Sequence, residues 1–143
     1  ESFQMERHGG MYLTLWYGVY DAAGRTLEYA SAGHPPALLK DSLGEVRRLQ
    51  TRNPPIGVME GRRFLHERAE LAPGSRLYVF SDGVFEIVDR DGREWGLEDF
   101  ERLVREPELP ATAESERLRA TVSRAHRDGR FEDDFSLLVV SFG

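Results

Sequence analysis

Apolar and polar positions alternate over the first two thirds of the chain, and this alternation predicts β-strands. Both faces of residues 11–20 and of residues 76–81 are largely apolar, so we expect other layers of the fold to cover these two strands on both sides. Short polar segments with glycine or proline separate neighbouring strands, which favours antiparallel hairpins. The predicted strands in this part of the chain cover residues 11–20, 26–32, 37–40, 45–49, 64–71 and 76–81.

The last third of the chain changes to a helical pattern and closes on one more strand. Apolar residues at helical spacing predict a helix over residues 97–105. Thr112 is expected to cap a second helix, which Gly129 closes. Residues 135–142 predict a final strand that is buried on both faces. Antiparallel strands with two covered faces imply that one sheet packs on another, so we expect an α+β fold with α-β-β-α layers.

Composition and charge narrow the class of protein. A chain of 143 residues with 40% hydrophobic and 31% charged residues is ordinary for one globular domain. Because cysteine is absent, disulfides, thiolate zinc sites and cysteine nucleophiles are excluded. The net charge of −6 argues against nucleic acid as a partner. No apolar run reaches the roughly 18 residues of a membrane helix, and no signal pattern occurs, so we expect a cytoplasmic protein without a membrane segment.

Two acidic segments lie beside predicted buried strands. Asp82 follows the strand over residues 76–81 and precedes Gly83, while Glu132, Asp133 and Asp134 directly precede the final strand. Each segment by itself is better explained as an ordinary turn, because Asp-Gly is a common turn dipeptide and adjacent acids favour solvent. Taken together, the two segments would suit a hard divalent cation such as Mg²⁺ or Mn²⁺, which prefers carboxylate oxygen.

A third segment combines a titratable side chain with a rigid loop. Gly33 and His34 stand before Pro35 and Pro36, and the prolines restrict the backbone around the histidine. The imidazole could act as a catalytic acid or base. Alternatively, it forms a hydrogen bond within its own loop, and the sequence slightly favours this structural role.

Five short motifs occur in a fixed order between Gly10 and Phe142. They are Ser31-Ala32-Gly33-His34-Pro35-Pro36-Ala37-Leu38-Leu39, Pro54-Pro55-Ile56-Gly57, Pro73-Gly74-Ser75-Arg76-Leu77, Ser81-Asp82-Gly83-Val84-Phe85-Glu86 and Asp133-Asp134-Phe135-Ser136-Leu137. In this order and spacing they resemble the metal-dependent protein phosphatases of the 2C type. The most similar subgroup is the bacterial SpoIIE/RsbU-like one.

This resemblance implies an α-β-β-α sandwich and the hydrolysis of phosphoserine or phosphothreonine on a protein. It also implies two Mn²⁺ or Mg²⁺ ions in the complete domain, with a water held between them as the nucleophile. Asp82 and Asp133 match metal ligands of the family, and Asp134 is expected either to bind a metal or to orient a water ligand. Gly33 and Gly83 match loops near the site, and the match leaves the role of His34 as a general acid open.

The chain departs from the family pattern at its beginning. The family has an upstream Gly-Asp motif that supplies a bridging metal ligand, and no such motif occurs before Met11. The sequence also begins without methionine, so we expect residues 1–143 to be a partial catalytic domain that lacks its N-terminal third. We therefore expect weak metal binding and little phosphatase activity from the 143-residue chain. A missing strand would also expose part of a sheet, which favours dimerisation through that surface.

Two functions remain open at this point. In the first, the parent protein is a regulatory phosphatase whose substrate is a phosphorylated anti-anti-sigma factor, as the resemblance implies, with a receiver or sensor domain upstream. In the second, it is a pseudophosphatase that binds a partner without hydrolysis. An unrelated interaction domain would explain the strands, but it would leave the positions of Asp82, Asp133 and Asp134 as a coincidence.

Overall fold

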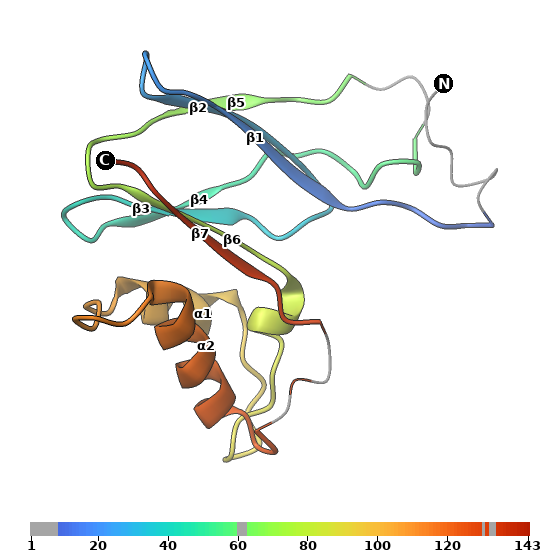
Figure 1. The fold of residues 1–143 in the computed structure, drawn as a ribbon. Coiled ribbons are helices and arrows are strands. Elements are labelled where there is room, and N and C mark those ends of the chain that lie inside the picture. The colour runs from blue at the N-terminus through green and yellow to red at the C-terminus, as the bar shows by residue number, and fades with distance from the viewer. Residues whose placement is uncertain (1–8, 60–62, 130, 132–133) are drawn as a thin grey trace. The chain divides into compact units, whose positions relative to one another are not determined.

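The computed structural model describes residues 9–59, 63–129, 131 and 134–143 (Figure 1). The chain divides into two compact units. The first unit contains residues 1–37 and 48–72, and the second contains residues 38–47 and 73–143. Each unit is built around an antiparallel sheet, and each is described by itself below.

The sheet of the first unit has the strand order β1-β2-β5. Its strands are β1 (Leu15–Asp21), β2 (Thr26–Ala32) and β5 (Glu67–Glu70). Strands β1 and β2 form the predicted antiparallel hairpin, in register from Leu15 opposite Ala32 to Asp21 opposite Thr26. The Asp21 carboxylate accepts a hydrogen bond from the Ala23 backbone N–H at 3.0 Å, which closes the turn between the two strands.

The prediction that other layers cover β1 on both sides is wrong for the described residues. Six of the seven β1 residues are exposed, and Tyr17 and Val19 are 60% and 52% exposed. The strand is exposed because it lies at the edge of its sheet, where β2 is its neighbour among the described strands. The central strand β2 is largely buried instead. The run from Met11 to Tyr20 contains no charged residue, so this exposed edge lacks the charges that usually protect an edge strand.

The second sheet has the strand order β4-β3-β6-β7. Its strands are β3 (Ala37–Lys40), β4 (Val46–Leu49), β6 (Arg76–Phe80) and β7 (Leu137–Ser141), and it belongs to the second unit apart from border residues of β3 and β4. Strand β6 is central and pairs with both β3 and β7, as its two apolar faces predicted. Its residues Tyr78 and Phe80 are almost fully buried.

Two helices pack on this second sheet and form its core. Helix α1 (Leu97–Arg105) has the predicted bounds, and α2 (Glu114–Ala125) follows it (Figure 1). The buried cluster joins side chains of the sheet to apolar side chains of both helices. Its members from the sheet and the two helices are Leu38, Tyr78, Phe80, Phe100, Leu103, Val104, Leu118 and Val122. Burial of these side chains is the main force that holds the second unit together.

Two further details differ from the sequence prediction. Strand β7 lies at the edge of its sheet and is half-buried, with Leu138 58% exposed, because it pairs only with β6 among the described strands. Helix α2 is not capped by Thr112, since its N-cap is Ala113 and no side chain caps it. Its α-helical part ends at Ala125, and Gly129 instead closes the turn that follows, through a hydrogen bond to the His126 carbonyl at 3.2 Å.

The predicted fold class is confirmed. The described residues form two antiparallel sheets with two α-helices, which is the α+β composition expected from the pattern. No helix within the described part of the chain has the length and apolar character needed to cross a membrane.

Candidate functional site

Asp82 lies at the point where the central strand β6 ends. It begins a short 3-10 helix, η2 (Asp82–Val84), and its side chain is exposed. The backbone carbonyl of Asp82 accepts hydrogen bonds from the N–H groups of Phe85 and Glu86, both at 2.9 Å. Its carboxylate Oδ1 accepts the Gly83 N–H at 3.0 Å, and Oδ2 has no partner in the described part of the chain. A fixed carboxylate with one open oxygen is therefore presented at the end of the strand.

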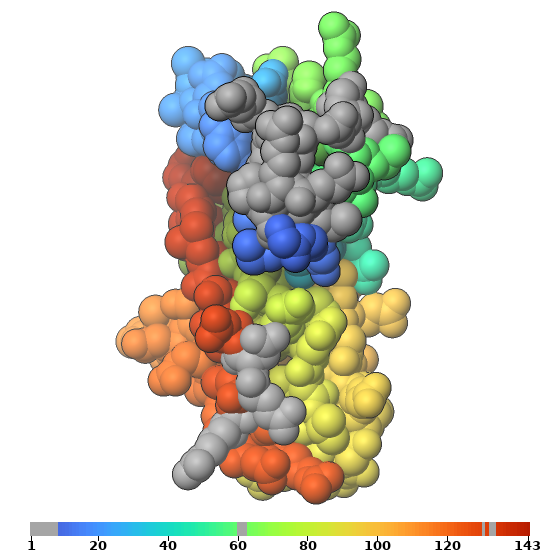
Figure 2. All heavy atoms as spheres, turned by 90° about the vertical axis from the view of Figure 1, so that its right-hand side faces the viewer, coloured from blue at the N-terminus to red at the C-terminus, as the bar shows by residue number. Residues whose placement is uncertain are grey.

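Ser81 ties this end of β6 to the segment that precedes β7. The Ser81 hydroxyl donates to the Asp134 carbonyl at 2.7 Å and accepts the Ser136 N–H at 3.0 Å. A third bond joins the Ser81 N–H to the Ser136 carbonyl at 3.0 Å. Figure 2 shows the two segments, in yellow-green and red-orange, reaching the surface side by side. Ser81, which directly precedes Asp82, is thus bonded to Asp134 at one end of the second sheet.

The acidic residues before β7 are only partly described. Glu132 and Asp133, the latter a predicted metal ligand, lie outside the described residues. Asp134 is described and exposed, and Ser81 fixes its backbone. Among the residues that the structure describes, no group of three acidic or histidine side chains is arranged to hold a metal. The donor set that is present, Asp82 with Asp134 nearby, consists of carboxylate oxygens, which fits a hard cation such as Mg²⁺ or Mn²⁺.

Gly33 and His34 belong to the first unit, and their loop is tightly held. Gly33 has a φ of +63°, and a Cβ there would lie 2.5 Å from Pro55 Cγ, so the position requires glycine. The half-buried His34 places Nδ1 2.9 Å from the Pro35 carbonyl oxygen. Because a carbonyl only accepts, Nδ1 carries the proton and Nε2 is the nitrogen left for other chemistry. This contact is the loop hydrogen bond that the sequence favoured for His34.

A buried polar network beneath this loop was missed by the sequence analysis. Ser31 and Thr51 exchange hydrogen bonds between hydroxyls and backbone groups, with the shortest from the Ser31 N–H to Thr51 Oγ1 at 2.7 Å. Asn53 donates to the Ser31 and Leu65 carbonyls and accepts the Leu65 N–H. Isolated Ser, Thr and Asn residues in apparent loops carry no sequence signal for such a network. It holds the Gly33–His34 loop in one conformation.

The segment after η2 forms a small hairpin that is anchored to α1. Asp89 accepts backbone N–H groups of Arg93 and Asp91 with Oδ1 and the Trp95 indole N–H with Oδ2. These hydrogen bonds, led by that of the Arg93 backbone, hold the pKa of Asp89 below its ordinary value. Arg93 in turn donates to both carboxylate oxygens of Asp99 at 3.0–3.1 Å. The hairpin is therefore fixed against the first turn of α1.

Asp99 is the anchor of this arrangement, and we expect its replacement to weaken the fold in a pH-dependent way. The buried carboxylate accepts hydrogen bonds from Arg93, Arg102 and the Gly96 N–H. The Arg93 bonds are the main cause of the lowered pKa of Asp99, followed by the Gly96 N–H. Asp99→Asn should lower the free energy of unfolding at pH 7 by about 1–2 kcal/mol.

The sign of the pH effect follows from the lowered pKa. Asp99 stabilises the fold above the unfolded pKa of about 3.9, and this contribution is lost as the pH falls through the lower folded pKa. The difference between wild type and Asp99→Asn should therefore shrink between pH 5 and strongly acidic pH, which urea unfolding at several pH values measures. Asp91→Asn, an exposed carboxylate on the same hairpin, is the control. Equal stability of wild type and Asp99→Asn at pH 7 would contradict this role.

Comparison with solved structures shows which class of protein has this fold. The structure of the PP2C phosphatase domain of the cell fate determinant SpoIIE from Bacillus subtilis, with a fragment of its regulatory domain, matches with a TM-score of 0.76. That match has 25% sequence identity and covers 90% of this chain and 37% of the other. A manganese-presoaked structure of the SpoIIE phosphatase domain matches with a TM-score of 0.68 and 25% identity, over 90% of this chain and 56% of the other. The fold is that of a PP2C phosphatase domain.

The chain belongs to the family of Stage II sporulation protein E (SpoIIE), whose family model matches residues 1–143. The phosphoserine phosphatase RsbP from Bacillus subtilis is 34% identical over 84 residues, which cover 59% of this chain and 21% of RsbP. The match thus covers about a fifth of the length of this curated relative. It covers 37% of the first matched structure and 56% of the second. The family resemblance inferred from the five motifs is confirmed.

Proposed function

We propose that the protein is a metal-dependent serine/threonine protein phosphatase that hydrolyses phosphoserine or phosphothreonine on a regulatory protein. The observation that carries this proposal is the fixed, half-open carboxylate of Asp82, which Ser81 joins to the acidic segment at Asp134. Membership of the SpoIIE family and similarity to a phosphoserine phosphatase support it.

We propose that Asp82, Asp133 and Asp134 contribute carboxylate oxygens to a site for Mn²⁺ or Mg²⁺ ions, because hard divalent cations prefer such ligands. When bound, such ions supply positive charge for the phosphoryl oxygens and lower the pKa of a coordinated water. The Gly83 N–H holds Oδ1 of the Asp82 carboxylate, which leaves Oδ2 as the oxygen proposed to bind a metal. Ser81 keeps the backbone of Asp134 in place and thereby limits how far the second acidic segment can move.

For Gly33 and His34, which belong to the first unit, we propose the roles that the family resemblance implies. The conformation of Gly33 and the polar network of Ser31, Thr51 and Asn53 keep this loop rigid. With Nδ1 protonated, His34 Nε2 is the atom that could accept or deliver a proton to a leaving group. We assign this role to His34 as part of the proposal.

The experiment that tests the proposed function is release of inorganic phosphate from a phosphoserine peptide with and without Mn²⁺. It is done with the 143-residue chain and with a full-length protein that contains it. We expect Mn²⁺-dependent turnover from the full-length protein and little from the 143-residue chain, which lacks the upstream Gly-Asp motif of the family. Full-length protein that binds the phosphopeptide without releasing phosphate would support the pseudophosphatase instead.

The proposed substrate is a phosphorylated anti-anti-sigma-like protein, acted on in the cytoplasm and controlled by an upstream receiver or sensor domain. The named similarity to a phosphoserine phosphatase supports a phosphorylated protein as the substrate class. The regulatory fragment attached to the matched SpoIIE phosphatase domain is an example of such a multidomain arrangement in that protein.

We also propose that the 143-residue chain self-associates through β1. The uncharged, largely exposed segment from Leu15 to Tyr20 can pair with the same segment of a second copy, because two antiparallel copies of one edge strand are self-complementary. Replacing Tyr17 and Val19 with lysine should shift the chain to monomer in sedimentation velocity, since like charges would face each other across the pairing. Leu138→Lys, on an exposed position of β7, is the control. A wild-type chain that stays monomeric at high concentration would contradict this proposal.

A further inference from the structure

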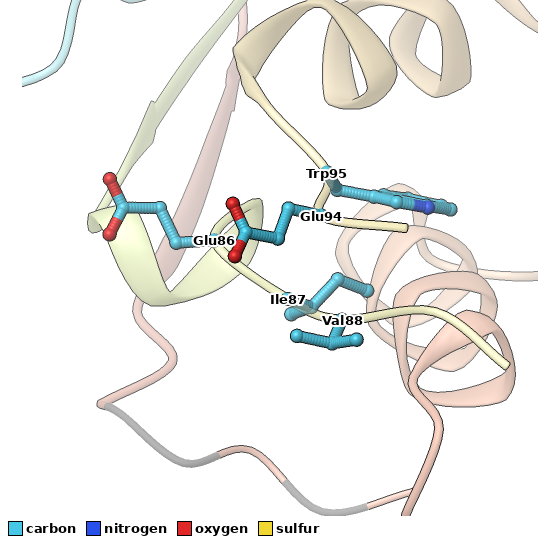
Figure 3. A pocket seen from close by; sticks show the side chains of 5 residues that line it. All are labelled: Glu86, Ile87, Val88, Glu94 and Trp95. Carbon is cyan, nitrogen blue, oxygen red and sulfur yellow. The ribbon is translucent and has the colours of Figure 1, made fainter. Parts of the chain in front are cut away.

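A pocket of about 370 Å³ lies in the second unit, directly after η2, and no step of the proposed chemistry uses it. It is lined by Glu86, Ile87, Val88, Glu94 and Trp95. Figure 3 shows the carboxylates of Glu86 and Glu94 pointing to the same side, while the Trp95 indole extends the opposite way, above Ile87 and Val88. The pocket therefore has an acidic end and an apolar end.

The walls of this pocket are fixed by backbone hydrogen bonds. The Glu86 N–H donates to the Asp82 carbonyl at 2.9 Å, and the Trp95 N–H donates to the Ile87 carbonyl at 2.8 Å. Val88 pairs with Glu94 in an antiparallel bridge, which joins the two arms of the hairpin. The Trp95 indole N–H donates to Asp89 Oδ2 at 3.2 Å, so the ring has a set orientation. The pocket is therefore preorganised, and binding of a ligand would not require the free energy of ordering its walls.

The two carboxylates at the acidic end form no ion pair in the described part of the chain. Neither Glu86 nor Glu94 has a hydrogen bond or ion pair from its side chain to another described residue, and both are exposed. Arg93, on the same hairpin, is already bound to Asp99 and Asp89. Two unpaired carboxylates on one side of a pocket repel each other, and a cation placed between them relieves that repulsion.

We propose that this pocket binds an arginine side chain of the phosphoprotein substrate, an inference that rests on the proposed function. The methylene stem of arginine fits the apolar end, formed by Ile87, Val88 and Trp95, and the guanidinium reaches the two carboxylates. A planar guanidinium has five N–H donors and can contact two carboxylates at once, which an ammonium does less well.

The position of the pocket indicates where in the substrate this arginine lies. Glu86 follows Asp82 by four residues and is hydrogen-bonded to its carbonyl, so the pocket adjoins the proposed metal-holding residue. A substrate with its phosphoserine at Asp82 therefore places an arginine only a few residues away in the pocket. The recognised feature is a basic residue close to the phosphoserine.

Binding is tested first, without any requirement for activity. The chain has two tryptophans, so ¹⁵N spectra contain two indole N–H signals, and Trp95→Phe identifies the one from the pocket. N-acetyl-arginine amide should shift the Trp95 signal in a saturable way, and the neutral N-acetyl-citrulline amide should not. Glu86→Gln with Glu94→Gln should abolish the shift, and Glu116→Gln, an exposed carboxylate on α2, should leave it unchanged.

The second test measures recognition during turnover by the full-length protein. Phosphoserine peptides that differ only in arginine or citrulline near the phosphoserine are compared. Arginine should raise kcat/KM by about two- to fivefold for each carboxylate engaged, and Glu94→Gln should reduce this preference, whereas the exposed control Glu116→Gln should retain it.

The outcomes separate the two proposals. An equal response to arginine and citrulline, or a response that survives both Gln replacements, would overturn the arginine pocket whether or not the protein is a phosphatase. A shift of the Trp95 signal by Mg²⁺ or Mn²⁺ alone, with none from arginine, would overturn it in favour of a metal site. Arginine binding without hydrolysis of any peptide would contradict the proposed function, but it would support recognition of arginine by the pocket.

Discussion

Asp82→Asn is expected to reduce the Mn²⁺-dependent phosphatase activity of the full-length protein by about a hundredfold or more. Replacement of groups that merely orient metal ligands costs about 10–100-fold, and Asp82 is proposed to be a ligand itself. Asparagine has nearly the same shape and can still accept the Gly83 N–H through its carbonyl oxygen, so the local fold should remain. What is lost is the negative charge and the second ligand oxygen.

The measurement is phosphate release over a range of Mn²⁺ concentrations, together with metal titration by calorimetry and thermal unfolding. Asp91→Asn removes the same charge from an exposed turn nearby and should keep wild-type activity. Asp133→Asn should act as Asp82→Asn does, because we propose the same metal-holding role for both residues. If both variants at Asp82 and Asp133 retain wild-type turnover, the assignment of the metal-holding residues is wrong.

Glu114→Ala is expected to lower the free energy of unfolding by about 3–5 kcal/mol. Glu114 and Arg117 form a buried ion pair on α2, with side chains that are 3% and 4% exposed and a closest distance of 2.8 Å. Arg117 also donates to the Leu103 carbonyl of α1 at 2.8 Å, and the Tyr78 hydroxyl of β6 contacts Glu114 at 3.4 Å. Removal of the carboxylate leaves a buried guanidinium without its main counter-charge.

The pKa values of Tyr78 and Arg117 are both raised, as expected for two groups beside the buried carboxylate of Glu114. Burial, and then the negative charge of Glu114, raises the pKa of Tyr78 well above its usual value, so the hydroxyl stays neutral and can donate. The hydrogen bonds from Arg117 to Glu114 raise the pKa of Arg117 further. The cluster thus links α1, α2 and the central strand through one charged pair.

Two further variants make this prediction specific. Glu116→Ala removes an exposed carboxylate from the same helix turn and should change stability by no more than about 0.5 kcal/mol. The double variant Glu114→Leu with Arg117→Met should be less destabilised than Glu114→Ala, because an apolar pair leaves no buried charge. Urea unfolding of the four proteins measures these differences. A loss below about 1 kcal/mol for Glu114→Ala would show that the pair does not stabilise the fold as described.

Much of the fold follows from local pattern. The bounds of β2, β3 and α1 were predicted residue by residue, because each is a short periodic run between clear turn signals. The central position of β6 followed from its two apolar faces. Both acidic segments were singled out from the sequence, but the bond from the Ser81 hydroxyl to the Asp134 carbonyl depends on the pairing of β6 with β7, which the sequence did not specify.

The tertiary structure decided the features that depend on neighbours. An apolar run such as Met11–Tyr20 has the same sequence pattern whether the strand lies at the edge of a sheet or at its centre. The order of the strands made β1 exposed and β7 half-buried. Glu114 looked like an ordinary acidic residue in a first turn, until packing placed it beside Arg117 away from water. The sequence by itself determined the periodicity, the family and the candidate carboxylates, because these are local in the chain. Strand order, the buried ion pair and the acidic pocket arise from contacts between distant segments, which only the folded chain defines.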